Sequence, residues 1–211
     1  MNAKQNLLEA GRQVVARELT GLQALIDQFD PAFLDVVGVL LKLRGKAFVA
    51  GAGTSGAIAQ RMAHLLSVCG SPALYLQPMD ALHGTMGAVT ADDALIAISR
   101  GGKSGELNQL AERVQARGAT VIALTSAVDA PLAQTADVVV LLPTDNAIDP
   151  GGVVAMGSTL VAGAWGDALA QVLMRAKGYS WEQLLFTHPA GAVGAEQHDL
   201  QPLEPLNAED L

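Results

Sequence analysis

The chain has 211 residues, of which 50% are hydrophobic and only 16% are charged, and its mean hydropathy is +0.31. This length and composition fit one well-buried domain and exclude disorder over most of the chain. The 13 basic and 21 acidic residues give a net charge of −8, which argues against generic nucleic-acid binding, since that needs clustered lysine and arginine. Aromatic residues make up 4%, too few for platforms on which bases stack.

The sequence also bears on where the protein is found. The longest apolar stretches, such as Val36–Leu41 and Val138–Leu142, are much shorter than the roughly 20 residues that cross a bilayer. The opening MNAKQNLLEAGRQ is polar where a signal peptide needs its apolar segment, and the single Cys69 has no partner for an internal disulfide. We therefore expect a soluble, cytoplasmic protein that binds no membrane.

The first elements in chain order are two helices, followed by strands. Residues 3–29 carry leucine and valine at helical spacing, and Asp30-Pro31 begins a second helix that extends to about Leu43. From Lys46 on, short apolar runs that end in small or turn-forming residues predict five buried strands: AFVAG, ALYL, ALIAIS, TVIALT and DVVVLL.

Further helices lie between and after these strands. The sequence predicts helices at Ser55–Ser67, Ser104–Arg117 and around Pro131–Thr135, a long helix over roughly Val153–Lys177, and a short one at Ser180–Leu185. Gly178 suits a left-handed cap at the end of the long helix. Because strands and helices alternate, we expect an α/β fold with a five-stranded parallel sheet covered on both faces.

We assign residues 1–194 to a single domain, with a helical pair over 1–44 and an α/β core over 45–194. The tail over 195–211 is acidic and has no apolar period, so we expect it to be loosely ordered or to dock on a neighbouring subunit. The apolar faces of the N-terminal helices and of the long helix exceed what one sheet can cover. This predicts a homodimer or, preferably, a homotetramer.

Two loops rich in glycine and serine follow predicted strands: Gly51–Gly56 (GAGTSG) and Ser99–Glu106 (SRGGKSGE). In an open parallel sheet, ligands bind beyond the carboxyl ends of the strands, where helix N-termini present unpaired N–H groups. One such loop is equally well explained by tight packing of a strand against a helix. Two of them in register, with Arg100 and Lys103 in the second, favour an anion-binding site.

Neither loop matches a nucleotide-binding motif in full. The first fits G-x-G-x-x-G, but the next predicted strand leads into Gln77–Asp80 without the acidic residue at its end that would hold a ribose. The second contains Gly102-Lys103-Ser104, but Ala97 stands where a P-loop has its first glycine. We therefore predict no nucleotide cofactor.

Several runs together resemble a known family. GAGTSG, ALHGTMG, AISRGGKSGE, ADVVVLL and THPAGAVG, in this order and at these separations, resemble the sugar isomerase (SIS) domain, and specifically its arabinose 5-phosphate isomerase branch. The resemblance covers about Gln13 to Gly194. It implies a three-layer α/β/α sandwich, a phosphosugar held by serine and threonine loops, and active sites shared between subunits of a dimer or tetramer. Longer members carry regulatory CBS domains, so we expect this chain to be the isomerase module alone.

The resemblance also implies roles for single residues. Glu106 matches the family's glutamate that acts on the substrate, and His83 and His188 match its two active-site histidines. The phosphate would be held by four side-chain hydroxyls and by two backbone N–H groups: those of Thr54, Ser55, Ser99 and Ser104, and those of Gly102 and Lys103.

Three positions depart from that branch. Thr54 replaces a lysine, Gly101 replaces a serine, and a second glutamate is missing near Ala147. Lys103, Asp145 or Asp149 could restore the lost charges from other positions. The identity of the sugar phosphate is therefore open.

The chemistry of aldose–ketose isomerisation fits these residues. The reaction moves a proton between neighbouring carbons through an enediol, so it needs a base and a group that polarises oxygen. We expect Glu106 to be the base and His188 to open the sugar ring or move protons. The simpler explanations are a helix-terminal acid at Glu106, a structural loop histidine at His188, and a core or interface histidine at His64.

No metal and no cofactor are predicted, because one cysteine and four separated histidines give no closely spaced pair of ligands. A metal at His83 or His188 remains an alternative. Two alternative functions also stay open: a phosphosugar-binding sensor that has lost catalysis, and another SIS-domain isomerase or lyase that acts on a hexose or heptose phosphate.

Overall fold

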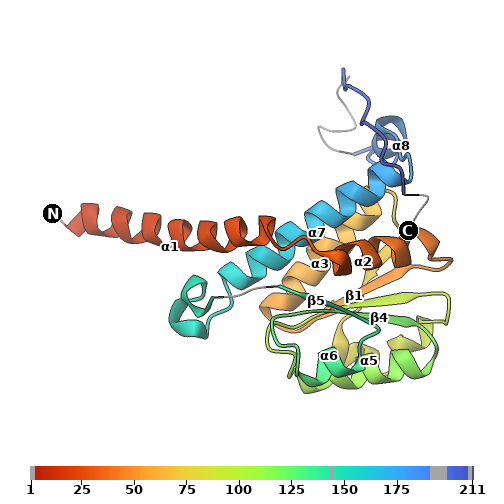
Figure 1. Ribbon diagram of the computed structural model, residues 1–211, viewed down its shortest axis with the longest axis horizontal. Coiled ribbons are helices and arrows are strands. Elements are labelled where there is room, and N and C mark those ends of the chain that lie inside the picture. Colours follow the sequence, from red (N-terminus) through yellow and green to blue (C-terminus); the bar gives the residue numbers. More distant parts are fainter. Residues whose placement is uncertain (1–2, 143–144, 191–198, 209–210) are drawn as a thin grey trace.

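The computed structural model describes residues 3–142, 145–190, 199–208 and 211. Its centre is a sheet of five parallel strands with helices on both faces (Figure 1). The spatial order is β2-β1-β3-β4-β5, formed by β1 (Ala47–Gly51), β2 (Ala73–Tyr75), β3 (Ala94–Ile98), β4 (Thr120–Thr125) and β5 (Val138–Leu141). The predicted three-layer α/β sandwich is confirmed, and each of the five apolar runs forms a strand.

Alternation along the strands builds two separate cores. Val49 pairs in register with Ile96, and Ile96 with Ile122. All three pack against one group of helices: α1 (Ala3–Ile26), α2 (Pro31–Lys42), α3 (Thr54–Val68) and α7 (Gly157–Ala176). The residues one position earlier point to the opposite face, as side chains of a strand do, and meet the other group: α4 (Pro78–Leu82), α5 (Gly105–Ala116) and α6 (Pro131–Thr135).

Local sequence explains where several helices begin and end. Asp30 accepts the N–H of Ala32 at 3.0 Å and Pro31 occupies the first helical position, so α2 begins where the sequence predicts. Gly178 has a φ of +62° after α7, and α8 (Trp181–Phe186) begins with a capping box between Ser180 and Gln183.

Two segments differ from the prediction. The long helix begins at Gly157, not at Val153, because residues 153–156 form turns and bends; before them lie the 3-10 turns η2 (Asn146–Ile148) and η3 (Pro150–Gly152). Gly151 and Gly152 have φ values of +63° and +68°, which no α-helix accommodates. The sequence reading also missed the short α4 and the 3-10 turn η1 (Thr85–Ala88).

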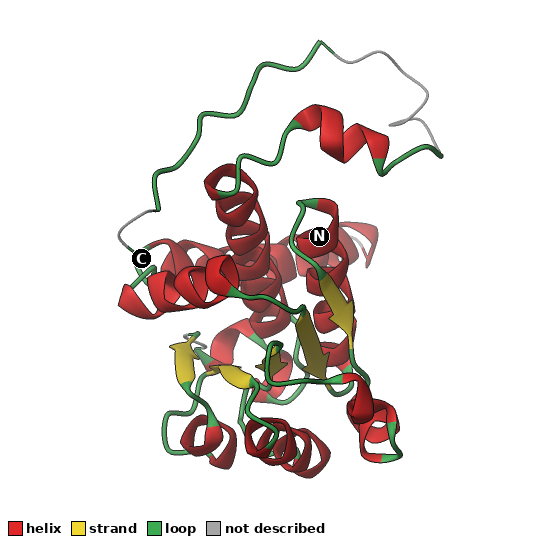
Figure 2. Cartoon of the chain, turned by 90° about the vertical axis from the view of Figure 1, so that its right-hand side faces the viewer, coloured by secondary structure: helices red, strands yellow, loops and turns green. Residues whose placement is uncertain are grey.

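The two ends of the chain behave differently. α1 projects from the body of the molecule (Figure 1), and Gly21 and Leu25 are its only buried residues. The described tail residues pack on their own chain beside α7 and α8 (Figure 2): Gln201 O accepts from Trp181 Nε1 at 2.9 Å, and Glu204 O accepts from Arg175 Nε at 2.7 Å. These residues form no helix or strand and are mostly exposed, and docking of the tail on a neighbouring subunit stays a prediction.

None of the helices in the described part of the chain combines the length and the apolar character that a bilayer crossing requires.

Candidate functional site

Both glycine-rich loops lie where the sheet changes direction. From β1 the chain passes through α3 to β2 on one side, and from β3 it passes through α5 to β4 on the other side. α3 and α5 cover opposite faces of the sheet. Such a switch point opens a crevice beyond the carboxyl ends of the two central strands, which is where open α/β sheets bind ligands.

The first loop joins β1 to α3. Gly53 has a φ of +57°, and α3 begins after it without a side-chain cap, so the N–H groups of its first turn have no partner within the helix. Gly51 and Gly56 serve packing: a Cβ on Gly51 would lie 2.7 Å from the Ser55 carbonyl oxygen, and one on Gly56 would lie 2.8 Å from that of Gly51. Thr54 is exposed and Ser55 half-buried at this helix start.

The second loop joins β3 to α5. Gly102 has a φ of +61° and is buried, and its N–H donates to the buried Ser99 Oγ at 3.1 Å. In the structure this N–H is bonded inside the loop, and its binding to phosphate stays a prediction. Lys103 is exposed, and the half-buried Ser104 precedes α5 without capping it, so its hydroxyl makes no bond to the helix start.

Glu106 lies in the first turn of α5, directly behind this loop, and its side chain is half-buried. The helix is tied back to the loop two residues later, where Asn108 Nδ2 donates to the carbonyl oxygen of Gly102 at 3.2 Å. The structure thus places a carboxylate beside a loop that presents hydroxyl groups. Whether Glu106 acts as a base stays a prediction.

The backbone of Arg100 fixes the second loop to the end of β4. Its carbonyl oxygen accepts three hydrogen bonds: from Thr125 Oγ1 at 3.0 Å, from Ser126 N at 2.9 Å and from Ser126 Oγ at 2.8 Å. The sequence reading did not single out Thr125 or Ser126, which follow the general pattern of small polar residues at a strand end.

The side chain of Arg100 reaches the segment between β5 and α7. Its Nη2 donates to Asn146 Oδ1 at 2.6 Å, its Nη1 donates to the Gly152 carbonyl oxygen at 3.1 Å, and Nη1 lies 2.9 Å from Asp149 Oδ2. Arg100 therefore joins three parts of the crevice: the second loop, the end of β4 and the approach to α7.

Asp149 is 1% exposed and caps α7. Its Oδ1 accepts the N–H groups of Met156 at 2.9 Å and of Ser158 at 3.0 Å. Burial raises the pKa of this carboxyl. Hydrogen bonds from Ser158 and Met156 and the charge of Arg100 lower the pKa by more than burial raises it, so the pKa lies below its usual value. Both oxygens thus face groups within the chain, and Asp149 is unsuited to act as a base.

Asp145 is the other acid that could replace the glutamate missing near Ala147. It is exposed, and its Oδ1 accepts the Ala147 N–H at 2.8 Å.

A small cavity of about 20 Å³ lies between the start of α3, the ends of β3 and β4, and the start of α7. Ile98, Leu124 and Leu142 form its apolar floor. Its polar wall combines hydroxyl groups with one guanidinium: Ser55, Arg100, Thr125, Ser126, Ser158 and Thr159. The Gly51–Gly56 and Ser99–Glu106 loops, which are distant in sequence, therefore meet at one site.

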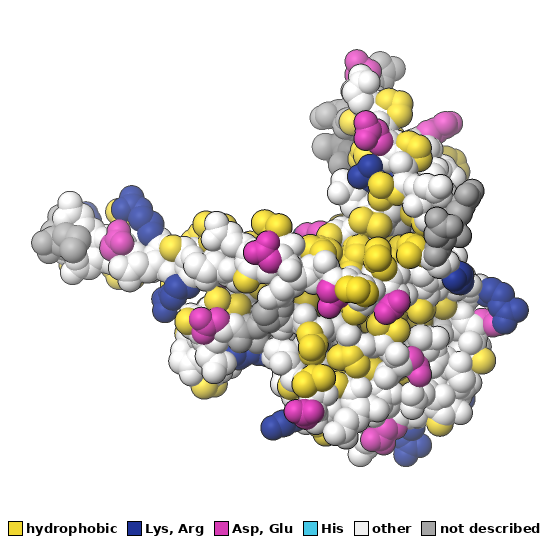
Figure 3. All heavy atoms as spheres, viewed as in Figure 1, with side chains coloured by type: hydrophobic (Ala, Val, Ile, Leu, Met, Phe, Trp, Pro, Cys, Tyr) yellow, Lys and Arg dark blue, Asp and Glu magenta, His cyan; other side chains and the backbone are white. Residues whose placement is uncertain are grey.

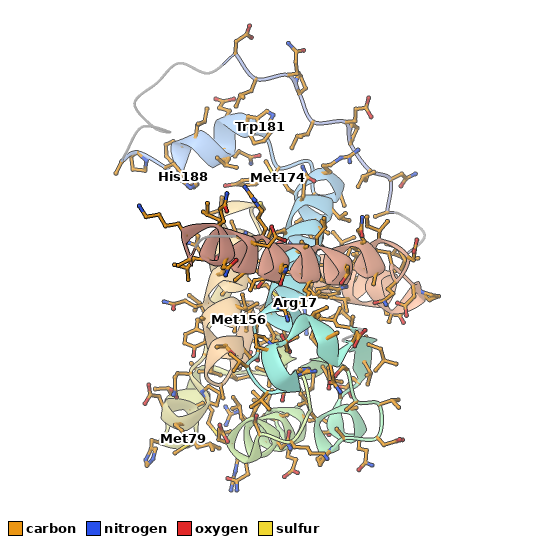
Figure 4. All side chains as sticks on the ribbon, turned by 90° about the vertical axis from the view of Figure 1, so that its left-hand side faces the viewer. Arg17, Met79, Met156, Met174, Trp181 and His188 are labelled. Atoms are coloured by element: carbon orange, nitrogen blue, oxygen red, sulfur yellow. The ribbon has the colours of Figure 1, made fainter. Side chains whose placement is uncertain are left out.

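The predicted histidines lie apart from one another. His83 is exposed at the end of α4, and Figure 4 shows Met79 of α4 and His188 at opposite ends of the molecule. His188 follows α8, with Nδ1 2.8 Å from the Leu184 carbonyl oxygen. His64 is exposed on α3, so it is not a core residue of the single chain.

His188 is also remote from the cavity. The cavity touches Ser158 at the start of α7, whereas α8 follows the end of that helix and lines a different pocket with Arg61 and Asp167. Residues 191–194 of the THPAGAVG run lie outside the described residues. Within the described ranges, no three His, Cys, Asp or Glu residues are grouped so that they could hold a metal.

Residues 40–171 match the model of the SIS domain. The chain belongs to the SIS domain family. It is 32% identical over 189 residues to arabinose 5-phosphate isomerase GutQ of Salmonella typhimurium, and 32% identical over 196 residues to arabinose 5-phosphate isomerase KdsD of Pseudomonas aeruginosa. These matches cover 90% and 92% of this chain, but only 59% and 60% of those SIS proteins.

Solved structures share the fold. A proposed sugar-phosphate isomerase of Listeria monocytogenes is 33% identical with a TM-score of 0.85, and the match covers 90% of this chain and 100% of that one. A protein of E. coli CFT073, solved in complex with arabinose 5-phosphate, is 28% identical with a TM-score of 0.85 over the same shares. The SIS resemblance seen in the sequence is confirmed.

Proposed function

We propose that this SIS domain is an aldose–ketose isomerase of a phosphorylated sugar, similar to arabinose 5-phosphate isomerase, and that it works through an enediol. The observation that carries the proposal is the position of Glu106, half-buried at the start of α5 behind a serine-containing loop at the switch point of the sheet. Relatives that are 32% identical over most of this chain are arabinose 5-phosphate isomerases, which supports the same reaction class.

The phosphate would lie between the two glycine-rich loops. Helix N-termini attract anions, and both α3 and α5 begin there without a side-chain cap. Hydroxyl groups and the exposed Lys103 would donate to the phosphate oxygens; the hydroxyl groups are those of Thr54, Ser55, Ser99 and Ser104. Ser99 also holds the loop in shape through Gly102, so it would act partly as a positioning residue.

In the reaction, the carboxylate of Glu106 would remove the proton from C2 of the open-chain aldose. The electron pair forms the C1–C2 double bond of the enediol, and the carbonyl oxygen at C1 gains a proton. Return of the proton from Glu106 to C1, with loss of the hydroxyl proton at O2, gives the ketose. His83 and His188 are the proposed groups for ring opening and for moving protons between O1 and O2. The scheme uses no cofactor and no metal.

We further propose that the enzyme is a homodimer or homotetramer with shared sites. His188 lies far from the cavity of its own chain, so a partner subunit would have to supply it. Hydrophobic side chains are exposed along α1 and near its junction with α2 and α7 (Figure 3); among them are Leu7, Leu8, Val15, Leu19, Ile26 and Leu34. Such faces are typical of interfaces between copies.

The compartment that we propose is the cytoplasm. Cys69 is a free thiol in the structure, which suits a reducing compartment.

The decisive assay is exchange of the C2 proton with solvent across pentose, hexose and heptose phosphates. We expect exchange and turnover with at least one member of this panel. Glu106→Gln keeps the shape of the side chain but cannot accept the proton, so it should lower turnover by a factor on the order of 10² to 10⁴ with little change in affinity. Glu112→Gln, an exposed change farther along α5, is the control and should be neutral.

Two results would contradict the proposal. If no member of the panel exchanged its C2 proton, the chain would not be an isomerase of these sugars. If Glu106→Gln raised the KM and left turnover unchanged, Glu106 would position the substrate and another group would be the base.

A further inference from the structure

Arg100 and Asp149 form an unusually buried ion pair in the wall of the cavity. Their side chains are 22% and 0% exposed, and Nη1 lies 2.9 Å from Oδ2. Each other ion pair in the described part of the chain has at least one side chain that is 42% or more exposed. Burial of two charges is costly unless they are paired, and here the pairing is the ion contact itself, since Oδ2 accepts no hydrogen bond of normal geometry within the described residues.

The negative charge of Asp149 cancels the positive charge of Arg100 within the wall of the cavity. Oδ2 of Asp149 faces the guanidinium, and Oδ1 accepts two N–H groups at the positive end of α7. The wall of the cavity therefore carries a guanidinium but no net positive charge. The two loops contribute only Ser55 and Arg100 to this cavity; elsewhere they present uncapped helix starts and Lys103, which has no ion-pair partner among the described residues.

The cavity is also small. Its volume of about 20 Å³ is close to the room that one water molecule needs, so it accommodates a single oxygen atom. The wall offers hydroxyl groups as donors and acceptors. Ser158 is 6% exposed, and within the described residues its Oγ makes no hydrogen bond of normal geometry although it lies beside the Asp149 carboxylate.

We propose that the Arg100–Asp149 pair determines specificity by making this cavity a subsite for one uncharged oxygen of the sugar, a hydroxyl or a carbonyl, and by rejecting a second phosphate. A lone guanidinium beside a helix N-terminus would attract a second anion. The buried carboxylate cancels that attraction and occupies the helix end itself. The inference rests on the proposed function only in taking the ligand to be a phosphorylated sugar.

The test compares binding of ribulose 5-phosphate and ribulose 1,5-bisphosphate by calorimetry, which needs no turnover. The wild-type chain should prefer the monophosphate. Asp149→Asn removes the balancing charge and should shift the ratio of the two affinities toward the bisphosphate by about tenfold. Adding Arg100→Gln to Asp149→Asn restores neutrality and should return the ratio close to the wild-type value.

A matched control addresses the change in overall charge. Asp167 pairs with Arg61 between α7 and α3, and both side chains are more than two-fifths exposed. Asp167→Asn removes the same charge from α7 outside the cavity, so the ratio of affinities should not change.

A second variant guards against loss of the fold, because Asp149 also caps α7. Arg100→Gln alone leaves that cap in place and leaves Asp149 unbalanced, so it should shift the ratio against the bisphosphate by about tenfold. Circular dichroism shows which variants are folded. An unchanged ratio in folded Arg100→Gln would overturn the inference.

The proposed function can fail separately. If the wild-type chain binds ribulose 5-phosphate but no sugar phosphate exchanges its C2 proton, the isomerase proposal falls and the affinity ratios still decide the specificity inference. If the wild-type chain binds no phosphorylated sugar at all, both are wrong.

Discussion

Asn108 Nδ2 donates a hydrogen bond to the carbonyl oxygen of Gly102 across 3.2 Å, and this bond ties the second turn of α5 to the loop that would hold the phosphate. Asn108→Ala removes one neutral hydrogen bond, worth roughly 0.5–1.5 kcal/mol, so the KM should rise about twofold to tenfold with little change in turnover. Steady-state kinetics test this. Gln109→Ala, on the exposed side of the same helix, is the control. Equal kinetics for the two variants would contradict a role for Asn108 in shaping the loop.

Ser104 and Ser99 should give different phenotypes. Ser104 does not cap α5, so Ser104→Ala should weaken binding of a phosphosugar about tenfold to a hundredfold through loss of a charge-assisted hydrogen bond, and leave the melting temperature unchanged. Ser99 Oγ accepts the Gly102 N–H, so Ser99→Ala should weaken binding and also lower the melting temperature. Calorimetry and thermal unfolding separate the two effects. A large loss of stability in Ser104→Ala would show that its hydroxyl supports the fold.

Asp93 is expected to make stability dependent on acid pH. It is 2% exposed, and it accepts the Lys46 N–H at 2.7 Å, the Thr90 N–H at 2.7 Å and the Thr90 hydroxyl at 2.8 Å. Burial raises the pKa of its carboxyl, but these hydrogen bonds and the Lys46 charge lower it more, so the net pKa is depressed. The stabilisation is therefore complete above the unfolded-state pKa of about 3.9 and is lost as the pH falls through the lower, folded-state pKa.

Asp93→Asn should accordingly cost about 1–3 kcal/mol in free energy of unfolding at pH 7, and the difference from the wild type should shrink below about pH 4. Urea denaturation at pH 7, 5, 4 and 3 measures it. The neighbouring Asp92 is exposed and pairs with Arg44 at the surface, so Asp92→Asn should cost much less. A cost for Asp93→Asn that stays constant over this range would exclude the titration.

Mixing of variants tests shared sites. Glu106→Gln and His188→Ala should each be inactive alone. If each site takes Glu106 from one chain and His188 from its partner, a mixed dimer contains one intact site. Random exchange of subunits should then restore about a quarter of the wild-type activity. Mixed assemblies that form, as shown by native mass spectrometry, but stay inactive would show that each site does not combine Glu106 of one chain with His188 of its partner.

Much of the fold is readable from the sequence because its signals are local. The runs from Ala47 to Gly51 and from Thr120 to Thr125 form strands over the predicted residues, since each is apolar and ends in a turn-forming residue. Val153–Met156 is predicted to be helical from its apolar and small residues and is not helical in the structure. Met156 has a φ of −115° and a ψ of −77°, and its N–H donates to Asp149 Oδ1, a contact that local composition does not reveal.

The two loops of the site were predictable from the sequence, but the contacts between residues far apart in the chain were not. Glycine and serine after β1 and β3 place the crevice, but the bond between Arg100 and Asp149 joins residues 49 positions apart and depends on how β5 leads into α7. The run Asp149-Pro150-Gly151-Gly152, shortly before the helix that begins at Gly157, was the available signal for a capping carboxylate. The backbone N–H of Gly102 is already bonded to Ser99 Oγ because Gly102 lies in a buried turn, and composition does not reveal that turn.

The projection of α1 also has a consequence for folding. Leu7, Val15 and Leu19 are 75%, 64% and 52% exposed, so most of this helix gains no burial from its own chain. A helix of this kind is marginal in water without tertiary contacts. Ordering of α1 is therefore coupled to whatever covers it, and amide hydrogen exchange in its first four turns should slow as protein concentration rises, while exchange in the strands stays constant.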